Sequence, residues 1–509
     1  MTSYAAAVVV LLTMPAAAQL SETVEVRVME IEATVRDSQN NPVENLTRDD
    51  FIVTIDGKPA EISNFFIVQR GVIRDNVSAE QDGVAAPPQT VPTRLVIIVD
   101  DVHLHQGPKT RALQAVGRYL QQTMDASTTA MLVRWHGALQ TRVKPTTRKD
   151  LLLSGLEAME KEPGVAARAD SERRTLLRMK EALPPDQYYQ AVLQFCESQQ
   201  RESTQTFDAI REILKSIAGM EGRKIVLFVS EGIPLLAGQE MIADAVGNKG
   251  NPLDAFRFDR SSDMRGVARA AQEAGVVFST LDPSPTVPAM DDPGLDYKRM
   301  RDNARDSVTH LARQTGGDVI FDRNDFEKEL LALDERVSTY YSIGARPPSS
   351  ARKSIRVQVK VKNQPRLRVL VSTRRNLTSG EEAIANAVRS QLYLREESNP
   401  LGALVAVAKT ELRNDRCVAS VAVQVPSERL TLLPNGETRG QIDVRFAVLD
   451  AREQESDIRT LTRNVRDETV VSELLSIGLR DRKYVVSMAI VDRLSGAVSY
   501  LQRDVRCGG

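Results

Sequence analysis

The stretch Leu95-Val96-Ile97-Ile98-Val99-Asp100-Asp101-Val102-His103-Leu104-His105 decides the fold of this chain. Its first five residues are apolar and mostly β-branched, which predicts a central parallel strand that is buried on both faces. Two aspartates and two histidines follow at the point where this strand should end. In open α/β sheets, ligands bind beyond the carboxyl ends of the strands, so we expect this segment to lie at the functional edge.

Strands and helices alternate on the carboxyl side of this stretch. We expect strands at 130–135, 139–143, 224–229, 276–281 and 319–321, and helices at 109–124, 205–218, 263–274, 302–314 and 325–333. Such alternation is typical of a parallel sheet covered by helices on both faces. The sequence therefore predicts an α/β domain over residues 94–345, with a doubly wound and mostly parallel sheet.

Helical patterns also fill residues 148–200, and we interpret this stretch as a helical insertion in the α/β domain. A solvated helical face is the favoured interpretation, and a lid or partner-docking element is the alternative. The solvated face is favoured because the stretch mixes basic and acidic side chains. They are Arg168, Arg173, Arg174, Arg178 and Lys180, and Asp170, Glu172 and Glu181.

The flanking regions are rich in β-strand patterns. Residues 19–70 predict an N-terminal β module, and residues 71–93 have the composition of a linker. Strands within 346–375 are expected to pack with the N-terminal module. A helical spacer over 376–398 then leads to a C-terminal β-sandwich-like module over 399–509.

The N-terminus predicts export. An apolar run over residues 4–14 precedes Pro15-Ala16-Ala17-Ala18, which is the pattern that a signal peptidase cuts, so residues 1–18 are interpreted as a signal peptide. A buried N-terminal strand is the alternative. The expected location is periplasmic or extracellular, with no membrane span in the mature chain. The net charge of −1, without a basic run, argues against a nucleic-acid partner.

Three cysteines are too few for a disulfide scaffold or a zinc ribbon. Cys417 and Cys507 both lie in the C-terminal β-rich region and could pair in an oxidising compartment, with two free thiols as the alternative. Cys196 falls in a helical pattern and is interpreted as a packing residue.

Polar residues gather where the predicted strands end. Besides Asp100, Asp101, His103 and His105, these are His136, Ser230, Glu231 and Asp282, and Thr204 at the start of the helix after the insertion. Charged groups at the ends of buried strands are costly unless they are paired or bound to a ligand. This edge is therefore the candidate binding site, and histidines that simply face solvent are the alternative.

Several short motifs occur in an order that resembles a von Willebrand factor type A domain, and in particular the VWFA-related family common in acidobacteria. The resemblance covers most of residues 20–375. It rests on Asp49-Asp50-Phe51, Asp56-Gly57-Lys58-Pro59, the strand ending in Asp100-Asp101, Ser230-Glu231-Gly232-Ile233-Pro234 and Tyr340-Tyr341-Ser342-Ile343-Gly344.

The resemblance implies a bound Mg²⁺ or Mn²⁺. Typical domains hold this ion with an Asp-x-Ser-x-Ser motif, a separate threonine and a later aspartate, because hard cations prefer oxygen ligands. Here Asp100 matches the first aspartate and Thr204 matches the threonine. The serine positions hold Val102 and Leu104, and the late aspartate is replaced by Ser230, with Glu231 beside it. The expected ion site is therefore degenerate.

A different frame, Asp101-x-His103-x-His105, combines nitrogen and carboxylate ligands that suit Zn²⁺. His136 could join such a site. Binding without any metal is the third alternative.

Three functions follow from these alternatives. The first is a non-enzymatic, adhesion-type protein that recognises a protein or a surface polymer at the carboxyl edge, where His136 and Asp282 would contribute. The second is a metal-assisted hydrolase that uses Asp101, His103 and His105. Against it, the sequence contains no Gly-x-Ser-x-Gly, His-Glu-x-x-His, phosphate-binding or dinucleotide-binding motif. The third is a structural envelope protein with a vestigial site.

Overall fold

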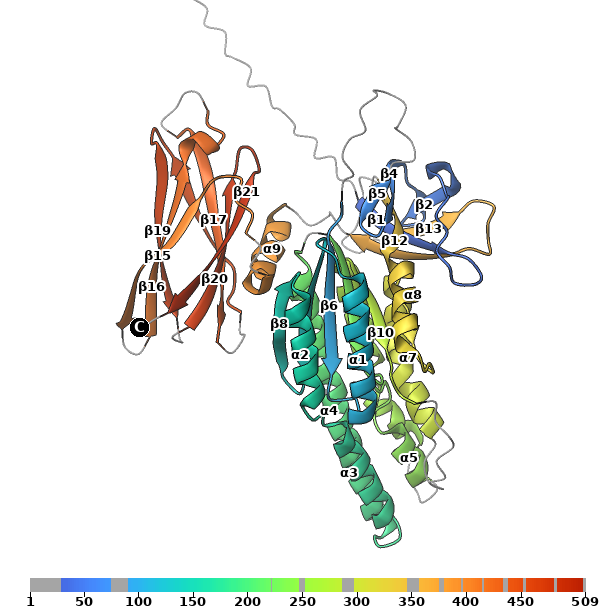
Figure 1. The fold of residues 1–509 in the computed structure, drawn as a ribbon. Coiled ribbons are helices and arrows are strands. Elements are labelled where there is room, and N and C mark those ends of the chain that lie inside the picture. The colour runs from blue at the N-terminus through green and yellow to red at the C-terminus, as the bar shows by residue number, and fades with distance from the viewer. Residues whose placement is uncertain are drawn as a thin grey trace, which may run out of the picture.

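A computed structural model (Figure 1) describes residues 29–74, 90–220, 222–246, 252–285, 297–345, 357–374, 380–394, 397–413, 416–433, 438–451, 455–479 and 483–506. The expected signal peptide and most of the expected linker lie outside these residues. Among the helices described, none is long and apolar enough to cross a membrane.

A six-stranded sheet forms the centre of the α/β domain. Its spatial order is β11-β10-β9-β6-β7-β8, all parallel except β8, which runs antiparallel to β7. Counted along the chain, this is the doubly wound order 3-2-1-4-5-6. The strands are β6 (Thr93–Asp100), β7 (Thr128–Trp135), β8 (Leu139–Thr146), β9 (Arg223–Val229), β10 (Val276–Leu281) and β11 (Val319–Ile320).

Both faces of this sheet are covered by helices (Figure 1). Leu95, Ile97 and Val99 of β6 pack in one buried cluster, with α1 (Gln106–Thr123), α2 (Lys149–Lys161) and α8 (Phe326–Ser338). Val96 and Ile98 pack in a second cluster, with α4 (Pro185–Ile217), α6 (Ser261–Glu273) and α7 (Tyr297–Thr315). Alternate side chains of β6 thus pack into two different cores, one on each face of the sheet, as the apolar run of this strand predicted.

The insertion differs from its prediction in one respect. It contains α2, α3 (Ala166–Met179) and the first half of α4, and α4 is a single helix of 33 residues. The expected break before residue 205 is therefore wrong, because no glycine or proline interrupts the chain between Pro185 and Gly219. α3 and the start of α4 project beyond the carboxyl ends of the strands (Figure 1), beside α5 (Gln239–Val246) and η2 (Pro252–Phe258).

Two small sheets form the N-terminal β region around a core that contains Phe51, Phe65 and Tyr341. β12 pairs with β1 and β4, so residues 339–345 belong to this sheet, although the sequence placed them at the end of the α/β domain over 94–345. The first sheet has the order β14 (Arg368–Arg374), β1 (Met29–Arg36), β12 (Thr339–Ala345), β4 (Ile62–Gln69) and β5 (Val72–Arg74). The second consists of β13 (Val357–Val361), β2 (Phe51–Ile55) and β3 (Lys58–Pro59), and η1 (Arg48–Asp50) precedes β2.

Two antiparallel sheets form the C-terminal region and share one apolar core. α9 (Gly380–Leu394) packs Val388 and Leu392 against this region. Its Ser390 Oγ also accepts the Gly219 N–H at 3.0 Å, so α9 contacts the α/β domain as well and is not a free spacer. The side chains of Cys417 and Cys507 lie outside the described residues, and Cys196 is a buried free thiol. The first sheet has the order β15 (Leu404–Arg413), β16 (Arg416–Pro426) and β19 (Val470–Leu479), and η3 (Ser427–Arg429) follows β16. The second has the order β18 (Arg459–Val465), β17 (Gly440–Asp450), β20 (Lys483–Asp492) and β21 (Val498–Arg506).

Candidate functional site at the carboxyl edge

The strand order of the sheet reverses between β6 and β9, and ligands of such sheets bind beyond the strand ends at this point. Asp100 ends β6 and Ser230 follows β9. The topology therefore brings them together, and the Ser230 hydroxyl donates to Asp100 Oδ2 at 2.8 Å. The sequence correctly placed both residues at one edge.

The Asp100 carboxylate is fully buried and is saturated by donors of the protein itself. Oδ1 accepts the backbone N–H groups of Val102 at 3.1 Å and His103 at 3.2 Å. Oδ2 accepts the Ser230 hydroxyl and faces His103 Nδ1 at 2.9 Å. Burial lowers the pKa of the His103 imidazole, but the charge and hydrogen bond of Asp100 outweigh it and raise this pKa above 6.5. His103 is thus the counter-charge of Asp100.

The other residues matched to the expected magnesium site lie elsewhere. Val102 and Leu104 are buried in apolar clusters, and Val102 packs with Trp135. Thr204 lies within α4, half-buried, and not at a helix start. Two residues further along α4, Thr206 Oγ1 accepts the Trp135 indole N–H at 2.9 Å. These residues do not fit a Mg²⁺ or Mn²⁺ ion, because the Asp100 carboxylate already has four donors and the Glu231 carboxylate faces His105.

Asp101 faces away from Asp100 and anchors the insertion. Its carboxylate lies 2.8 Å from Lys109 Nζ and also pairs with Arg134 Nε, and both Asp101 and Lys109 are fully buried. The same two cations bind the connection between α2 and α3. Lys109 donates to the Glu162 carbonyl at 2.7 Å, and Arg134 donates to the Pro163 carbonyl at 3.0 Å.

The backbone of Asp101 strengthens this attachment. Its carbonyl accepts the Val165 N–H at 2.8 Å. At Gly164, a Cβ would lie 3.0 Å from the carbonyl oxygens of Asp101 and Leu104, so the two loops touch through a glycine. The insertion therefore covers the segment that follows β6.

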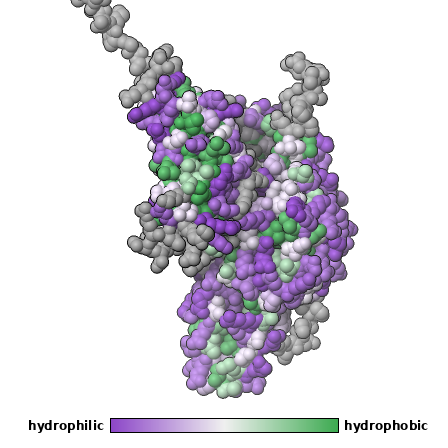
Figure 2. Space-filling view, turned by 60° about the vertical axis from the view of Figure 1, so that its left-hand side comes forward, coloured by the Kyte–Doolittle hydropathy of each residue, from purple (hydrophilic) through white to green (hydrophobic). Residues whose placement is uncertain are grey.

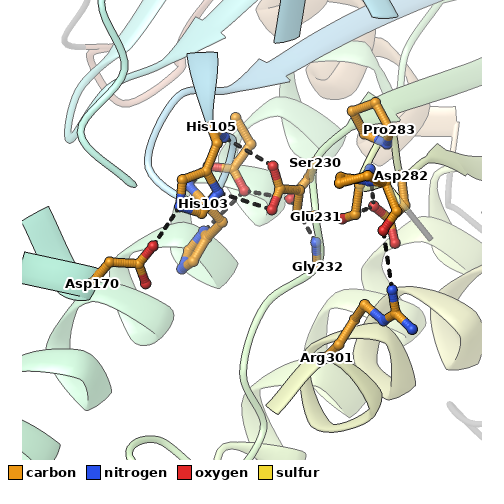
Figure 3. A network of polar contacts seen from close by, with 12 residues as sticks. His103, His105, Asp170, Ser230, Glu231, Gly232, Asp282, Pro283 and Arg301 are labelled. Atoms are coloured by element: carbon orange, nitrogen blue, oxygen red, sulfur yellow. Dashed lines mark hydrogen bonds and ion pairs between the residues drawn. The ribbon is translucent and has the colours of Figure 1, made fainter. Parts of the chain in front are cut away.

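His105 is held between two carboxylates (Figure 3). Its Nδ1 lies 2.9 Å from Glu231 Oε2, and its Nε2 lies 2.9 Å from Asp170 Oδ2 on α3. The hydrogen bonds of Asp170 and Glu231 raise the pKa of His105 to about 10, so the imidazole is a cation with both nitrogens in use. This contact ties α3 to the edge of the sheet.

Beyond His105, the chain of ion pairs continues to α5. Arg173 Nη1 lies 2.7 Å from Asp170, and its Nε lies 2.9 Å from Glu240. Arg173 is only 8% exposed. The predicted solvated face of the insertion is therefore wrong for Arg173, which is a buried structural cation.

The second expected metal set is not assembled. Asp101 faces Lys109 and Arg134, whereas His103 faces Asp100 and His105 faces Glu231 and Asp170. Because their side chains contact different partners, the residues do not fit Zn²⁺. Across the described ranges, no group of three or more His, Cys, Asp or Glu side chains is arranged to hold a metal ion.

The two residues expected at the partner-binding edge have different environments. Asp282 is fully buried and accepts from Arg305 Nε at 2.5 Å and from the Ser284 hydroxyl at 2.5 Å. Arg305 also reaches Asp322 at 3.0 Å. His136 lies in the β7–β8 turn, and its buried Nδ1 has no hydrogen-bond partner among the described residues.

Sequence reasoning missed the cations that neutralise this edge, which are Lys109, Arg134 and Arg305. Arg134 did carry a signal, since it stands in the apolar run Met131-Leu132-Val133 of β7 and is followed by Trp135. A lone arginine in a buried strand requires a buried acid. Lys109 and Arg305 lie in helices whose composition gives no comparable signal.

A groove of about 630 Å³ lies at the same edge, between η2 and the first turns of α6 and α7. Phe256 of η2 lines it, together with acidic and basic side chains that include Asp259, Lys298 and Asp302. Phe256 is 67% exposed, which is high for an aromatic side chain. Exposed aromatic residues at the rim of a groove are typical of protein-binding surfaces.

Comparison with solved structures gives several bacterial proteins of low sequence identity. A von Willebrand factor type A protein from Catenulispora acidiphila has 7% identity and a TM-score of 0.23 over 95% of this chain and 74% of its own. The vWF domain of the type V pili tip protein Mfa5 from Porphyromonas gingivalis has 10% identity and a TM-score of 0.27 over 48% and 96%. BatB from Bacteroides thetaiotaomicron has 12% identity and a TM-score of 0.25 over 48% and 98%.

Two of these structures are described as a von Willebrand factor type A protein and as a vWF domain, and this is the family that the sequence resembles. At such low TM-scores, nothing about the site follows from these structures. No family model and no curated protein matches the sequence.

Proposed function

We propose that this chain is an exported, non-enzymatic, adhesion-type protein that recognises a protein or a surface polymer at the carboxyl edge of its α/β sheet without a bound ion. The observation that carries the proposal is the pairing of Asp100 with His103 at 2.9 Å. A buried carboxylate needs a counter-charge, and the imidazolium of His103 supplies it from within the chain.

Recognition is assigned to the groove beside Phe256 rather than to Asp100. Asp100, Asp101 and Asp282 are each fully buried and contact protein donors, so a partner has no access to their oxygens. Phe256 and Leu253 are 67% and 66% exposed on η2, and the groove adds charged groups of both signs. An apolar anchor surrounded by polar groups is the usual composition of a binding surface.

Catalysis is not supported by the contacts of the three residues that a hydrolase would use. Asp101 and His105 are each held by two oppositely charged groups, and His103 is held by Asp100. No side chain in this group is left as a metal ligand or a nucleophile.

The test is capture of partners from an envelope extract by the immobilised full chain, in Mg²⁺ and in excess EDTA. The expected result is the same set of partners in both buffers, loss of this set in Phe256→Asp, and retention in the control Leu494→Asp. Leu494 is also exposed, at 47%, but lies in the C-terminal region.

Three results would overturn the proposal. Capture that requires Mg²⁺ would restore the ion-dependent interpretation. One equivalent of tightly bound zinc in the purified chain would favour the hydrolase. Capture that is unaffected by Phe256→Asp would place recognition on another surface and leave this edge with a structural role.

A further inference from the structure

In the described part of the chain, the C-terminal sandwich has four edge strands, and three of them are protected. Exposed strand edges pair with other chains unless charges, bulges or covering segments prevent it. β18 carries Arg459 and Arg463 on its short length. β21 is covered by Ser398, which exchanges two backbone hydrogen bonds with Tyr500 at 3.1 and 2.7 Å. β15 has a register shift after Val407.

Two further features protect β15. Its sequence contains Lys409, Glu411 and Arg413. In addition, Arg503 of β21 donates to the Val405 carbonyl at 2.7 Å. A second chain would have to displace this arginine and approach several charges.

Among the described residues, β19 has neither a register shift nor a covering segment. Over Val470–Leu479, it pairs with β16 in a continuous antiparallel register, and in the part of the chain that the structure describes no other strand pairs with it. Its single charged residue is Glu473, which is held by Arg463 of β18 at 3.4 Å. Long, regular and weakly charged edge strands are the kind that recruit another strand.

The outward residues of β19, and the residues of β16 that pair with them, are uncharged as well. The register aligns Leu404 with Gln424 and Ser472, and Ala406 with Ala422 and Leu474. Leu474 is 61% exposed and Leu404 is 65% exposed. Figure 2, in which this side of the molecule comes forward, shows apolar residues gathered over the C-terminal sandwich.

We propose that β19 is a self-association edge, at which two copies of this chain pair their β19 strands antiparallel and form one continuous six-stranded sheet. The occupant is a second copy because β19 is complementary to itself. A two-fold axis at Leu474 aligns Ser472 with Ser476 of the second copy and Val470 with its Gly478. Outward residues then meet outward residues, as the alternation of a strand requires.

The single charge favours the same arrangement. With the axis at Leu474, Glu473 lies opposite Leu475 of the second copy, and the two glutamates do not face each other directly. Like charges directly opposite each other would oppose pairing. The interface rests on backbone hydrogen bonds and small side chains, and it does not involve the groove at the carboxyl edge.

The test compares two leucines of nearly equal exposure at the two edges of one sheet. Sedimentation of the full wild-type chain is expected to show a monomer–dimer equilibrium. Leu474→Lys places two lysines opposite each other and should weaken dimerisation roughly tenfold or more. Leu404→Lys, at the opposite edge, should behave like the wild type. Circular dichroism and melting of each variant confirm that it is folded.

A covalent measurement fixes the geometry. Because opposite Cβ atoms in an antiparallel pair lie about 5 Å apart, Leu474→Cys should form a disulfide-linked dimer under mild oxidation. Leu404→Cys should not exceed the wild type. A wild-type chain that stays monomeric, or an equal effect of both lysine variants, would overturn the proposal, since the latter means packing of faces and not pairing of edges.

Discussion

The two edges of the α/β sheet use the same kind of interaction with opposite signs. At the carboxyl edge, the strand end supplies an acid, Asp101, and neighbouring elements supply Lys109 and Arg134. At the amino edge, β9 begins with a base, Arg223, and β1 of the N-terminal region supplies its acid, Glu32. Both pairs are buried, and both attach another part of the chain to the sheet.

The two edges differ in the part of the chain that they attach to the sheet. Arg223 also donates to the Val337 carbonyl at 3.0 Å and lies 3.9 Å from the ring centre of Tyr340, so it joins the N-terminal β region to the sheet. Asp101 joins the helical insertion. Charged strand ends therefore mark places where this chain docks on itself, and a ligand is not needed to explain them.

Removal of the acid at the carboxyl edge is expected to have the largest effect. Asp101→Ala leaves the buried Lys109 without a counter-charge and leaves Arg134 with Glu162 alone, which should lower the free energy of unfolding by about 3–5 kcal/mol. Denaturant titration measures this change, with the fluorescence of Trp135 as the signal of unfolding. Trp135 is the only tryptophan in the sequence and lies in the α/β domain.

Asp150→Ala is the matched control for this variant. Asp150 pairs with Arg148 at 2.5 Å, but both side chains are about two-thirds exposed. Such an exposed pair is screened by solvent and contributes little to stability, so Asp150→Ala should be close to neutral. Equal losses in the two variants would mean that Asp101 does not hold the insertion.

The amino edge should be less sensitive. Glu32→Gln removes the counter-charge of Arg223 but leaves the Val337 carbonyl and the Tyr340 ring, so we expect a loss of roughly 2 kcal/mol. The same titration measures it, with Glu157→Gln as the control because Glu157 pairs with Lys161 on an exposed helix face. A loss as large as that of Asp101→Ala would remove the distinction between the edges.

The sequence predicts much of this sheet because its signals are local. The apolar run of β6 and the alternation of strands and helices follow from backbone periodicity, and the topological rule then brings Asp100 and Ser230 together. The contacts that decide the site are not local. His105 meets Asp170 across 65 positions and Glu231 across 126, and no periodicity records which acid a histidine faces.

One missed feature was nevertheless available in the sequence. The uninterrupted helical composition from Pro185 to Gly219 indicates one long helix and places Thr204 in its interior. Matching Thr204 to the threonine of the family motif placed it at a helix start instead. A residue can match a motif in sequence although the backbone around it has a different geometry.

A smaller effect is expected at the contact between the insertion and the segment after β6. Gly164→Ala puts a methyl group 3.0 Å from two backbone carbonyl oxygens, which should cost roughly 1–2 kcal/mol. Gly107→Ala is the control, since its Cβ would meet nothing within 4 Å at the start of α1, and alanine is the better helix former. A neutral Gly164→Ala would show that the two loops are not in tight contact.

The smallest effect at the carboxyl edge is expected from His105, and it should appear in the pH dependence of the unfolding free energy. Hydrogen bonds to Asp170 and Glu231 raise the pKa of His105 from 6.5 to about 10. A pKa raised by folding gives stability that is complete below the unfolded value of 6.5 and is lost as the pH rises through 10. At the acid end, burial raises the pKa of Asp170, but His105 and Arg173 lower it below 3.8, so its contribution is lost only in stronger acid.

The difference in unfolding free energy between wild type and His105→Ala should therefore be on the order of 1 kcal/mol near pH 5.5, since the pair is more than one-third exposed, and should shrink toward zero by pH 10. His310→Ala provides the opposite sign, because burial and neighbouring arginines lower the pKa of His310. The contribution of His310 should grow as the pH rises toward 6.5. A wild-type minus His105→Ala difference that stays flat from pH 6.5 to 10 would mean that His105 is neutral in the fold and does not form an ion pair with Asp170 of the insertion.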